Sequence, residues 1–147
     1  MGPDLTTFMF KLLHQILPTA ERVSRILPNK SPNCARCTGP ATDTLLHSFF
    51  DCPTSHAAGE VLLVALRTII PNLTPTKLLT LDFDLSEEES FPITWSIAHF
   101  LSSSWQLRAA NKPIELYTIR SEMEAACRLL REESLATTSD MLNQIFS

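Results

Sequence analysis

Glycine is scarce in this chain of 147 residues, and the three glycines that occur, Gly2, Gly39 and Gly59, lie far apart. Phosphate-binding loops and the strained turn that carries a nucleophilic serine each need at least two close glycines, because the backbone must approach a ligand or turn sharply. The sequence therefore excludes the common nucleotide-binding loops and the G-x-S-x-G hydrolase site.

Long apolar runs are also missing. No stretch approaches the ~18–20 uninterrupted apolar residues of a membrane helix, and the longest candidate, residues 61–70, contains Arg67. The apolar N-terminal segment is interrupted by Lys11 and His14, and Asp4 stands where a signal peptide carries a basic flank. We therefore expect an intracellular protein, cytoplasmic or nuclear, with neither a membrane nor a small-molecule substrate as its partner.

Charge is sparse but apolar content is ordinary. Charged residues make up 19% of the chain and hydrophobic residues 44%, against about 25% and 45–50% in typical soluble domains. A chain of this length suits one domain with a substantial core of its own. Intrinsic disorder is not expected beyond short loops.

Apolar residues recur at helical spacing through most of the chain, and no segment alternates convincingly with a period of two. The predicted fold is all-α, a helical domain with an embedded knuckle loop that carries three of the four cysteines. We expect two parts that pack as one compact unit: residues 1–70, which include the knuckle at 28–53, and a helical tail at 71–147. The expected helices span about residues 5–17, 19–27, 43–51, 53–70, 90–109 and 114–134, with a final turn within 140–146.

Local signals refine these helices. Ser86 and Glu89 have the form of a capping box ahead of the helix at 90–109. In the last long helix, opposite charges alternate at a spacing of four, which predicts an exposed face. This face consists of Arg120, Glu124, Arg128 and Glu132.

Several candidate site residues have ordinary structural explanations. His14 and His99 lie on apolar helices and are expected to be packing residues with satisfied hydrogen bonds. Cys127 stands alone in a helix and is expected in the core. Phe49 and Phe50 are adjacent, so either both are buried on opposite sides or one offers a stacking face to an unpaired base.

Three cysteines and one histidine form the pattern C-x2-C-x9-H-x4-C, from Cys34, Cys37, His47 and Cys52. Two thiolates on a tight turn and a second pair from a helix and its end suit a tetrahedral zinc ion. On a continuous α-helix Cys52 would point about 140° away from His47, but Pro53 ends the helix there and lets Cys52 turn back.

Two alternatives to this ligand set stay open at the level of sequence. His56 competes with His47 as the nitrogen ligand, since it follows Cys52 by one helical turn. The cysteines could instead be small buried side chains or form a disulfide, although metal binding is the commoner role of this spacing in an intracellular protein.

The residues around this pattern carry a resemblance. The run at 11–19 (KLLHQILPT), the Cys34–Cys37 loop, the segment at 43–50 (DTLLHSFF) and Cys52 resemble the zinc-binding region that follows the reverse transcriptase in non-LTR retrotransposon proteins. The similarity is specific over residues 10–53 and loose in the helical tail. It implies zinc ligation by the four residues named above, and it implies the polymerase part of a larger polyprotein as a possible partner.

Catalytic residues of that family do not carry over. The paired-aspartate turn of a polymerase is missing, since the segment at 82–84 (DFD) stands alone in an acidic stretch. A restriction-type nuclease needs a carboxylate two residues before a lysine to hold a metal and orient water, and none of the four lysines has one. We therefore expect no enzymatic activity from this chain.

Charge is uneven along the sequence, which suggests a partner. Residues 1–40 have a net charge of +3, whereas residues 78–147 have a net charge of −6. Basic residues bind phosphates, so the predicted contacts with single-stranded or structured RNA or DNA are Arg22, Arg25, Lys30 and Arg36. The alternative is a retroelement remnant that serves as a structural or protein-interaction scaffold, in which zinc only stabilises the fold.

Overall fold

Helices dominate the computed structural model, which describes the backbone of residues 3–37 and 39–132 and the side chains of residues 4–37 and 39–125. Within these residues the only β-type pairing is an isolated bridge between Asn33 and Thr42, so the predicted all-α class is confirmed. The elements are α1 (Pro3–Leu13), α2 (Ala20–Ile26), the π-helical turn η1 (His47–Asp51), α3 (His56–Arg67), α4 (Pro75–Thr80), α5 (Glu87–Ala109) and α6 (Leu116–Glu132).

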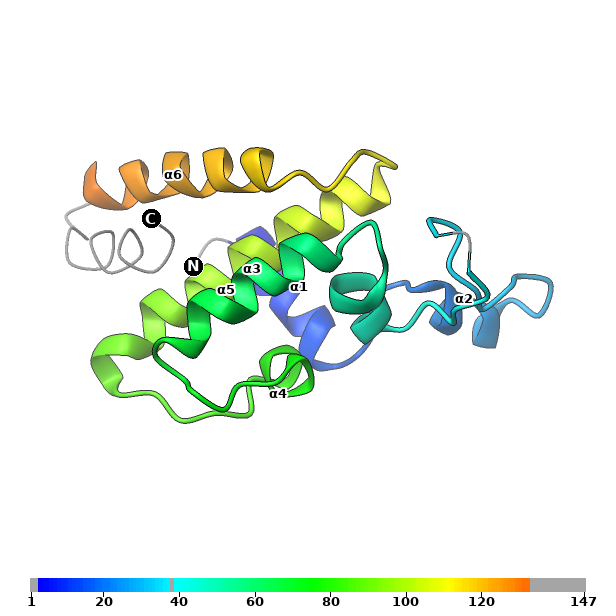
Figure 1. Cartoon of the computed structure of the whole chain (residues 1–147), viewed down its shortest axis with the longest axis horizontal. Coiled ribbons are helices and arrows are strands. Elements are labelled where there is room, and N and C mark those ends of the chain that lie inside the picture. The colour runs from blue at the N-terminus through cyan, green and yellow to red at the C-terminus, as the bar shows by residue number, and fades with distance from the viewer. Residues whose placement is uncertain (1–2, 38, 133–147) are drawn as a thin grey trace.

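Helix α5 is the centre of the fold. It contacts α1, α3, α6 and η1, and these elements surround it in the view of Figure 1. Ile93, Ile97 and Leu101 on α5 are almost completely buried. A helix that buries apolar residues on several sides is typical of a core position, and here α5 provides the surface on which the rest of the chain packs.

The ends of α5 follow from local chemistry. Ser86 caps the N-terminus, since its Oγ accepts a hydrogen bond from the Glu89 backbone N–H at 3.3 Å and donates to the Glu89 carboxylate at 2.7 Å. The Ser86 half of the predicted capping box is therefore present, with the Glu89 carboxylate bonded to the Ser86 hydroxyl. The helix begins directly at Glu87 rather than at residue 90. Asn111 has a left-handed backbone (φ 57°) just past the other end, as is common at helix C-termini.

Two further predicted helix boundaries were wrong, and one helix was missed. Helix α1 ends at Leu13 rather than near residue 17, because Gln15 adopts a left-handed backbone (φ 56°). Helix α3 begins at His56 rather than Pro53, after a turn. Helix α4 was not expected, although Thr74 caps it and Pro75 occupies its first position, where the missing N–H of proline costs nothing.

Helix α6 agrees with the predicted helix at 114–134 over the residues described. Arg120 and Glu124 form an exposed ion pair at 3.9 Å, as the alternating charges predict. The side chains of Cys127, Arg128 and Glu132, and the expected turn at 140–146, lie outside the described residues. No helix among the residues described is long and apolar enough to cross a membrane.

The two histidines predicted to be packing residues with satisfied hydrogen bonds behave differently. His14 is exposed, but it stacks on Phe10 with ring centroids 4.1 Å apart and donates to the Phe10 carbonyl, so it packs and is hydrogen-bonded as predicted. His99 is half-buried against Trp95, but its Nδ1 has no hydrogen-bond partner among the described residues. Burial lowers the pKa of His99, which keeps the ring neutral.

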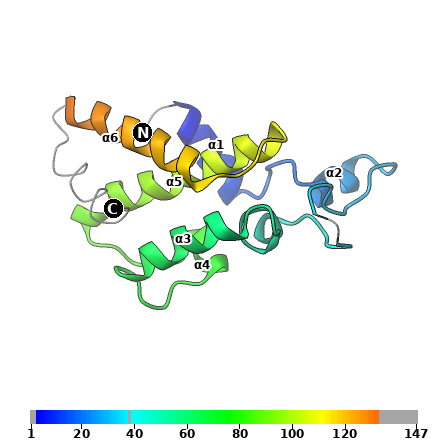
Figure 2. The same cartoon turned by 45° about the horizontal axis from the view of Figure 1, so that its top comes forward.

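Residues 18–44, here called the arm, project from one end of the helical body in both views (Figures 1 and 2). The arm contains α2, which has no fully buried side chain, and the loop that carries Cys34 and Cys37. Ile26 and Leu27 at the end of α2 are 65% and 50% exposed. The arm therefore has almost no apolar core of its own and depends on other interactions to hold its shape.

Where the arm meets the body, Phe49 and Phe50 are both buried, with 2% and 4% of their surfaces exposed. Phe49 packs on Trp105 of α5 with ring centroids 5.8 Å apart. Neither ring is available to stack on a nucleic-acid base, so the alternative in which both are core residues is correct. Gly59 of α3 lets η1 approach closely, because a Cβ there would lie 2.4 Å from the Phe49 carbonyl oxygen.

We expect Gly59→Ala to destabilise the protein, even though alanine normally favours a helix by about 1 kcal/mol over glycine. The clash is with backbone and with the Phe50 ring, so the expected loss in the free energy of unfolding is about 1–3 kcal/mol. Urea unfolding monitored by circular dichroism measures this change. The matched control is Gly39→Ala, which meets nothing within 4 Å. Equal stability of the two variants would contradict the packing described.

Candidate metal centre

Four side chains meet where the arm joins the body. The Sγ atoms of Cys34, Cys37 and Cys52 and a ring nitrogen of His47 all lie within 4.8 Å of one another. The two cysteines of the loop come from the arm, whereas His47 and Cys52 come from η1 and the residue that follows it. The structure thus brings together all four predicted ligands at a spacing that suits one metal ion.

The loop that presents Cys34 and Cys37 is closed by backbone hydrogen bonds. The Cys34 N–H donates to the Ala41 carbonyl at 2.8 Å, and the Asp43 N–H donates to the Pro32 carbonyl at 2.9 Å. The Arg36 N–H points at the Cys34 sulfur at 3.3 Å. These bonds fold the proline-rich segment back on itself, so that both thiols face η1.

A π-helical turn places the second pair. The Cys52 N–H donates to the His47 carbonyl at 2.8 Å, an i→i+5 bond that replaces the i→i+4 bond of an α-helix. The sequence predicted an ordinary helix ended by Pro53, with Cys52 turning back afterwards. Cys52 does adopt an extended backbone (φ −64°, ψ 130°), but the wider turn before it also brings His47 and Cys52 together.

The cluster is compact and mostly enclosed. Cys34 and Cys52 are buried, with their sulfurs 3.9 Å apart. The Cys37 sulfur lies 3.6 Å from His47 Nε2. His56, the competing ligand in the sequence analysis, is exposed, and its Nδ1 donates to the Phe50 carbonyl at 2.8 Å. It is not part of the cluster.

A buried ion pair lies directly behind the cysteines. Arg108 of α5 donates through Nη2 to the Cys34 sulfur at 3.0 Å and to Asp43 Oδ1 at 2.8 Å. Asp43 also accepts from the Ser48 hydroxyl at 2.7 Å and from the Ala20 N–H at 2.9 Å. One carboxylate therefore links the start of α2, η1 and α5.

Neither partner of this ion pair was identified as a site residue from the sequence. Asp43 appeared only as the start of a predicted helix and of the segment at 43–50 that carries the resemblance, and Arg108 was not singled out. A buried pair that spans 65 residues of chain leaves no local pattern. The one available signal was that Arg108 lies among the apolar residues of a core helix.

The electrostatics of the cluster differ from thiol to thiol. Burial alone would raise the pKa of the Cys52 thiol, but hydrogen bonding to Thr54 and to Arg108 lowers it to about 6. Burial and the neighbouring Cys34 raise the pKa of Cys37. For Arg108, burial opposes the charge, but hydrogen bonding with Cys52 and Cys34 raises its pKa. Cys52 thus favours the thiolate, which is the form that binds metal ions.

The four basic residues predicted to contact nucleic acid do not share one environment. Arg36 is half-buried, and its guanidinium donates to the backbone carbonyls of Arg108 and Lys112 at the C-terminus of α5, at 2.5 and 3.1 Å. A cation is stabilised at that end of a helix by the helix dipole. Arg36 therefore fastens the loop to α5 rather than facing solvent.

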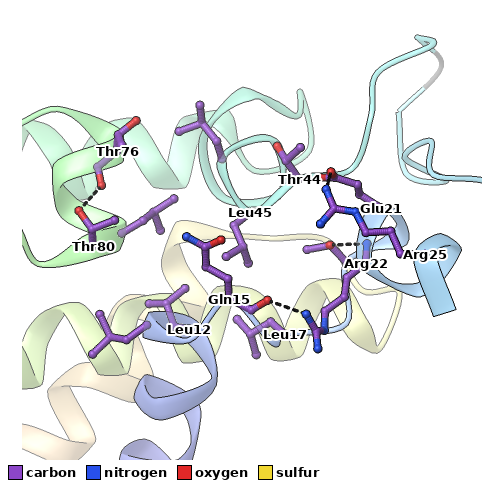
Figure 3. Close-up of a pocket in the computed structure, with 14 residues that line it drawn as sticks. Leu12, Gln15, Leu17, Glu21, Arg22, Arg25, Thr44, Leu45, Thr76 and Thr80 are labelled. Atoms are coloured by element: carbon purple, nitrogen blue, oxygen red, sulfur yellow. Dashed lines mark hydrogen bonds and ion pairs between the residues drawn. The ribbon is translucent and has the colours of Figure 1, made fainter.

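Of the other three basic residues, Arg25 and Lys30 are exposed, whereas Arg22 is half-buried like Arg36. Arg22 donates to the Gln15 carbonyl at 3.2 Å, and Arg25 pairs with Glu21 on the same helix. Figure 3 shows both arginines at one end of a cavity of about 320 Å³ between the arm, α1 and α4. Lys30 is exposed in the loop after α2. Arg25 and Lys30 thus give the arm an accessible basic surface, and the half-buried Arg22 lies beside it.

No protein-family model, curated protein or solved structure matches this chain. Any statement about its function therefore depends on the cluster and on the residues around it.

We expect Asp43→Ala to lower the free energy of unfolding by about 3–5 kcal/mol, because it leaves the buried Arg108 charge without its carboxylate partner. Chemical denaturation of the purified chain measures the loss. Glu21→Ala serves as the control, since it removes an exposed carboxylate that pairs with Arg25, and it should cost no more than about 0.5 kcal/mol. Comparable losses in both variants would show that the Asp43–Arg108 pair contributes no more to the free energy of unfolding than an exposed pair does.

Proposed function

We propose that Cys34, Cys37, His47 and Cys52 hold one zinc ion, and that this ion has a structural role. Three thiols and one imidazole form a donor set typical of structural zinc sites. Soft sulfur ligands favour zinc over magnesium or calcium, which prefer oxygen. No carboxylate is among the four clustered side chains.

The distances within the cluster support this assignment. Zinc–sulfur bonds of about 2.3 Å and zinc–nitrogen bonds of about 2.0–2.1 Å give a tetrahedron with edges of about 3.8 Å between sulfurs and about 3.6 Å between sulfur and nitrogen. The Cys34–Cys52 and Cys37–His47 separations are 3.9 and 3.6 Å. Four protein ligands would fill the tetrahedron and leave no position for a substrate or a reactive water.

The position of the cluster explains what the ion would stabilise. Two ligands lie on the arm and two on or just after η1, which packs on α3 and α5. The arm has little apolar surface to bury, so a metal crosslink supplies stability that packing does not. In this proposal zinc fixes the arm to the body, while the helical core folds without it.

At the level of the whole chain, we propose a non-catalytic accessory module of a retrotransposon reverse transcriptase protein. The support is the resemblance over residues 10–53 together with the clustering of the four side chains to which the resemblance assigns zinc ligation. The arm would then present Arg22, Arg25 and Lys30 to single-stranded RNA or DNA. The observation that favours nucleic-acid binding is the exposure of Arg25 and Lys30 on a projecting basic arm.

The second candidate is a scaffold without nucleic-acid affinity. It is favoured by the ties of Arg36 to α5 and of Arg25 to Glu21, which reduce the number of free cations. The burial of both adjacent phenylalanines also removes the expected stacking surface. The two candidates differ in one measurable property, which is salt-dependent binding to single strands.

For the zinc site, we expect native mass spectrometry to find one zinc per chain. His47→Ala should lose the ion or bind it much more weakly, because a tetrahedral site then lacks one ligand. Hydrogen exchange should accelerate within residues 28–53 but little in α5, since the core does not depend on zinc. His56→Ala is the matched control and should keep full zinc content. A metal-free parent chain, or loss of zinc only in the His56 variant, would refute the assignment.

For the basic surface, we expect weak binding to single-stranded RNA with a log–log salt slope of about −2, from three cations at ~0.7 per neutralised phosphate. Fluorescence anisotropy at several salt concentrations measures the slope. Combining Arg25→Glu with Lys30→Glu should weaken binding and flatten the slope toward about −1, with zinc content unchanged.

The matched control for this experiment combines Lys11→Glu with Lys77→Glu. These two exposed bases lie on α1 and α4, so the control makes the same change in net charge on the body of the molecule. It should bind like the parent. If both double variants bind equally well, the arm is no nucleic-acid surface and the scaffold function is favoured.

A further inference from the structure

The guanidinium of Arg108 occupies an unusual position next to the metal cluster. Its Nη2 is shared between the Cys34 sulfur and the Asp43 carboxylate, at 3.0 and 2.8 Å. Only 9% of the residue is exposed. Burying a charge this deeply is costly unless strong partners compensate for it. Here the partners are one carboxylate and one sulfur atom of the cluster.

The charge balance explains why a cation belongs at this place. Three thiolates, one neutral imidazole and a divalent ion carry a net charge of −1, since each cysteine gives up its proton on binding. Asp43 adds a second negative charge beside them. A single buried guanidinium between the two stabilises both, and a planar guanidinium has several N–H donors to reach two acceptors at once.

We propose that Arg108 and Asp43 are positioning residues of the metal centre, through which metal binding and the docking of α5 against the arm become coupled. Arg108 donates a hydrogen bond to a ligand sulfur, and Asp43 holds the guanidinium in place. Asp43 is itself fixed by Ser48 of η1 and by the Ala20 N–H of α2. This inference rests on the proposed zinc site. It adds that a residue of α5 takes part in metal binding, which the zinc site alone does not imply.

Arg108 Nη1 provides a further observation. This atom is buried and has no hydrogen-bond partner among the described residues. A buried donor without an acceptor costs free energy, and such a group is expected to have a reason. We attribute the burial of this unpaired donor to the adjacent sulfur ligands. Their negative charge, once a metal ion is bound, attracts the guanidinium as a whole.

The chain offers a matched control for this inference. Arg36 also joins the loop to α5, because its guanidinium donates to the carbonyls of Arg108 and Lys112. It connects the same two parts of the molecule but donates to no sulfur through its side chain. Arg36→Gln therefore removes a tie between arm and body, whereas Arg108→Gln removes a tie and also the cation at the sulfur.

The test is titration of the metal-free full chain with cobalt(II), whose thiolate-to-metal absorption band reports on the sulfur ligands. We expect Arg108→Gln to lower cobalt affinity about 10–100-fold, as is usual for groups that hydrogen-bond a ligand. The band should also move to lower energy, because a thiolate without its hydrogen bond donates charge more readily. Arg36→Gln should leave the band unchanged, although it lowers stability.

Arg108→Lys keeps the charge, but the lysine side chain is one bond shorter, so its ammonium does not reach the position of Nη2 between the two acceptors. Its cobalt affinity and band position should fall between those of the parent and those of Arg108→Gln. If the glutamine variant does not fold, the lysine variant provides the test of the inference. A parent-like band and affinity in either folded variant, or the same band shift in Arg36→Gln, would overturn the inference. Failure of the parent chain itself to bind cobalt or zinc would instead refute the proposed metal site.

Discussion

The buried contact between Asp43 and Arg108 is the interaction on which the arrangement of this molecule depends. It is the point where the arm, η1 and α5 meet, and among the ion pairs of the described residues it is the buried one. The Arg25–Glu21 pair lies on one helix and in solvent, where such pairs contribute little. By contrast, the Asp43 carboxylate satisfies two side chains and one backbone N–H from three separate elements.

Much of the fold could be predicted because its determinants are local. The helical spacing of apolar residues, the Ser86 capping box and the prolines identified the all-α class and most of the helices. The short helix α4 was missed because its six residues are too few to show a period. The early end of α1 was missed because Gln15 adopts a left-handed backbone, which glutamine rarely does.

In the candidate site, too, the local part could be predicted from the sequence and the long-range part could not. Its four clustered side chains lie within one short segment, so their spacing predicted the cluster. The choice between His47 and His56 stayed open until the structure placed His56 outside it. The environment of the cluster was not predictable from spacing. Whether Arg36 meets solvent or the end of α5, and whether Phe49 meets a base or Trp105, depends on contacts between residues far apart in sequence. The π-helical turn is likewise set by packing, since no residue pattern specifies an i→i+5 bond.

The long separation between Arg108 and the cluster has a consequence for how the molecule is made. All four clustered side chains leave the ribosome well before Arg108, which follows Cys34 by 74 positions. Local loops close faster than distant contacts form, so the arm can gather its thiols while α5 is still unfinished. During synthesis the cluster therefore passes through a stage in which its negative charge has no guanidinium beside it. The arrival of α5 completes the site last, because α5 supplies the contact that is most distant from Cys34 in sequence.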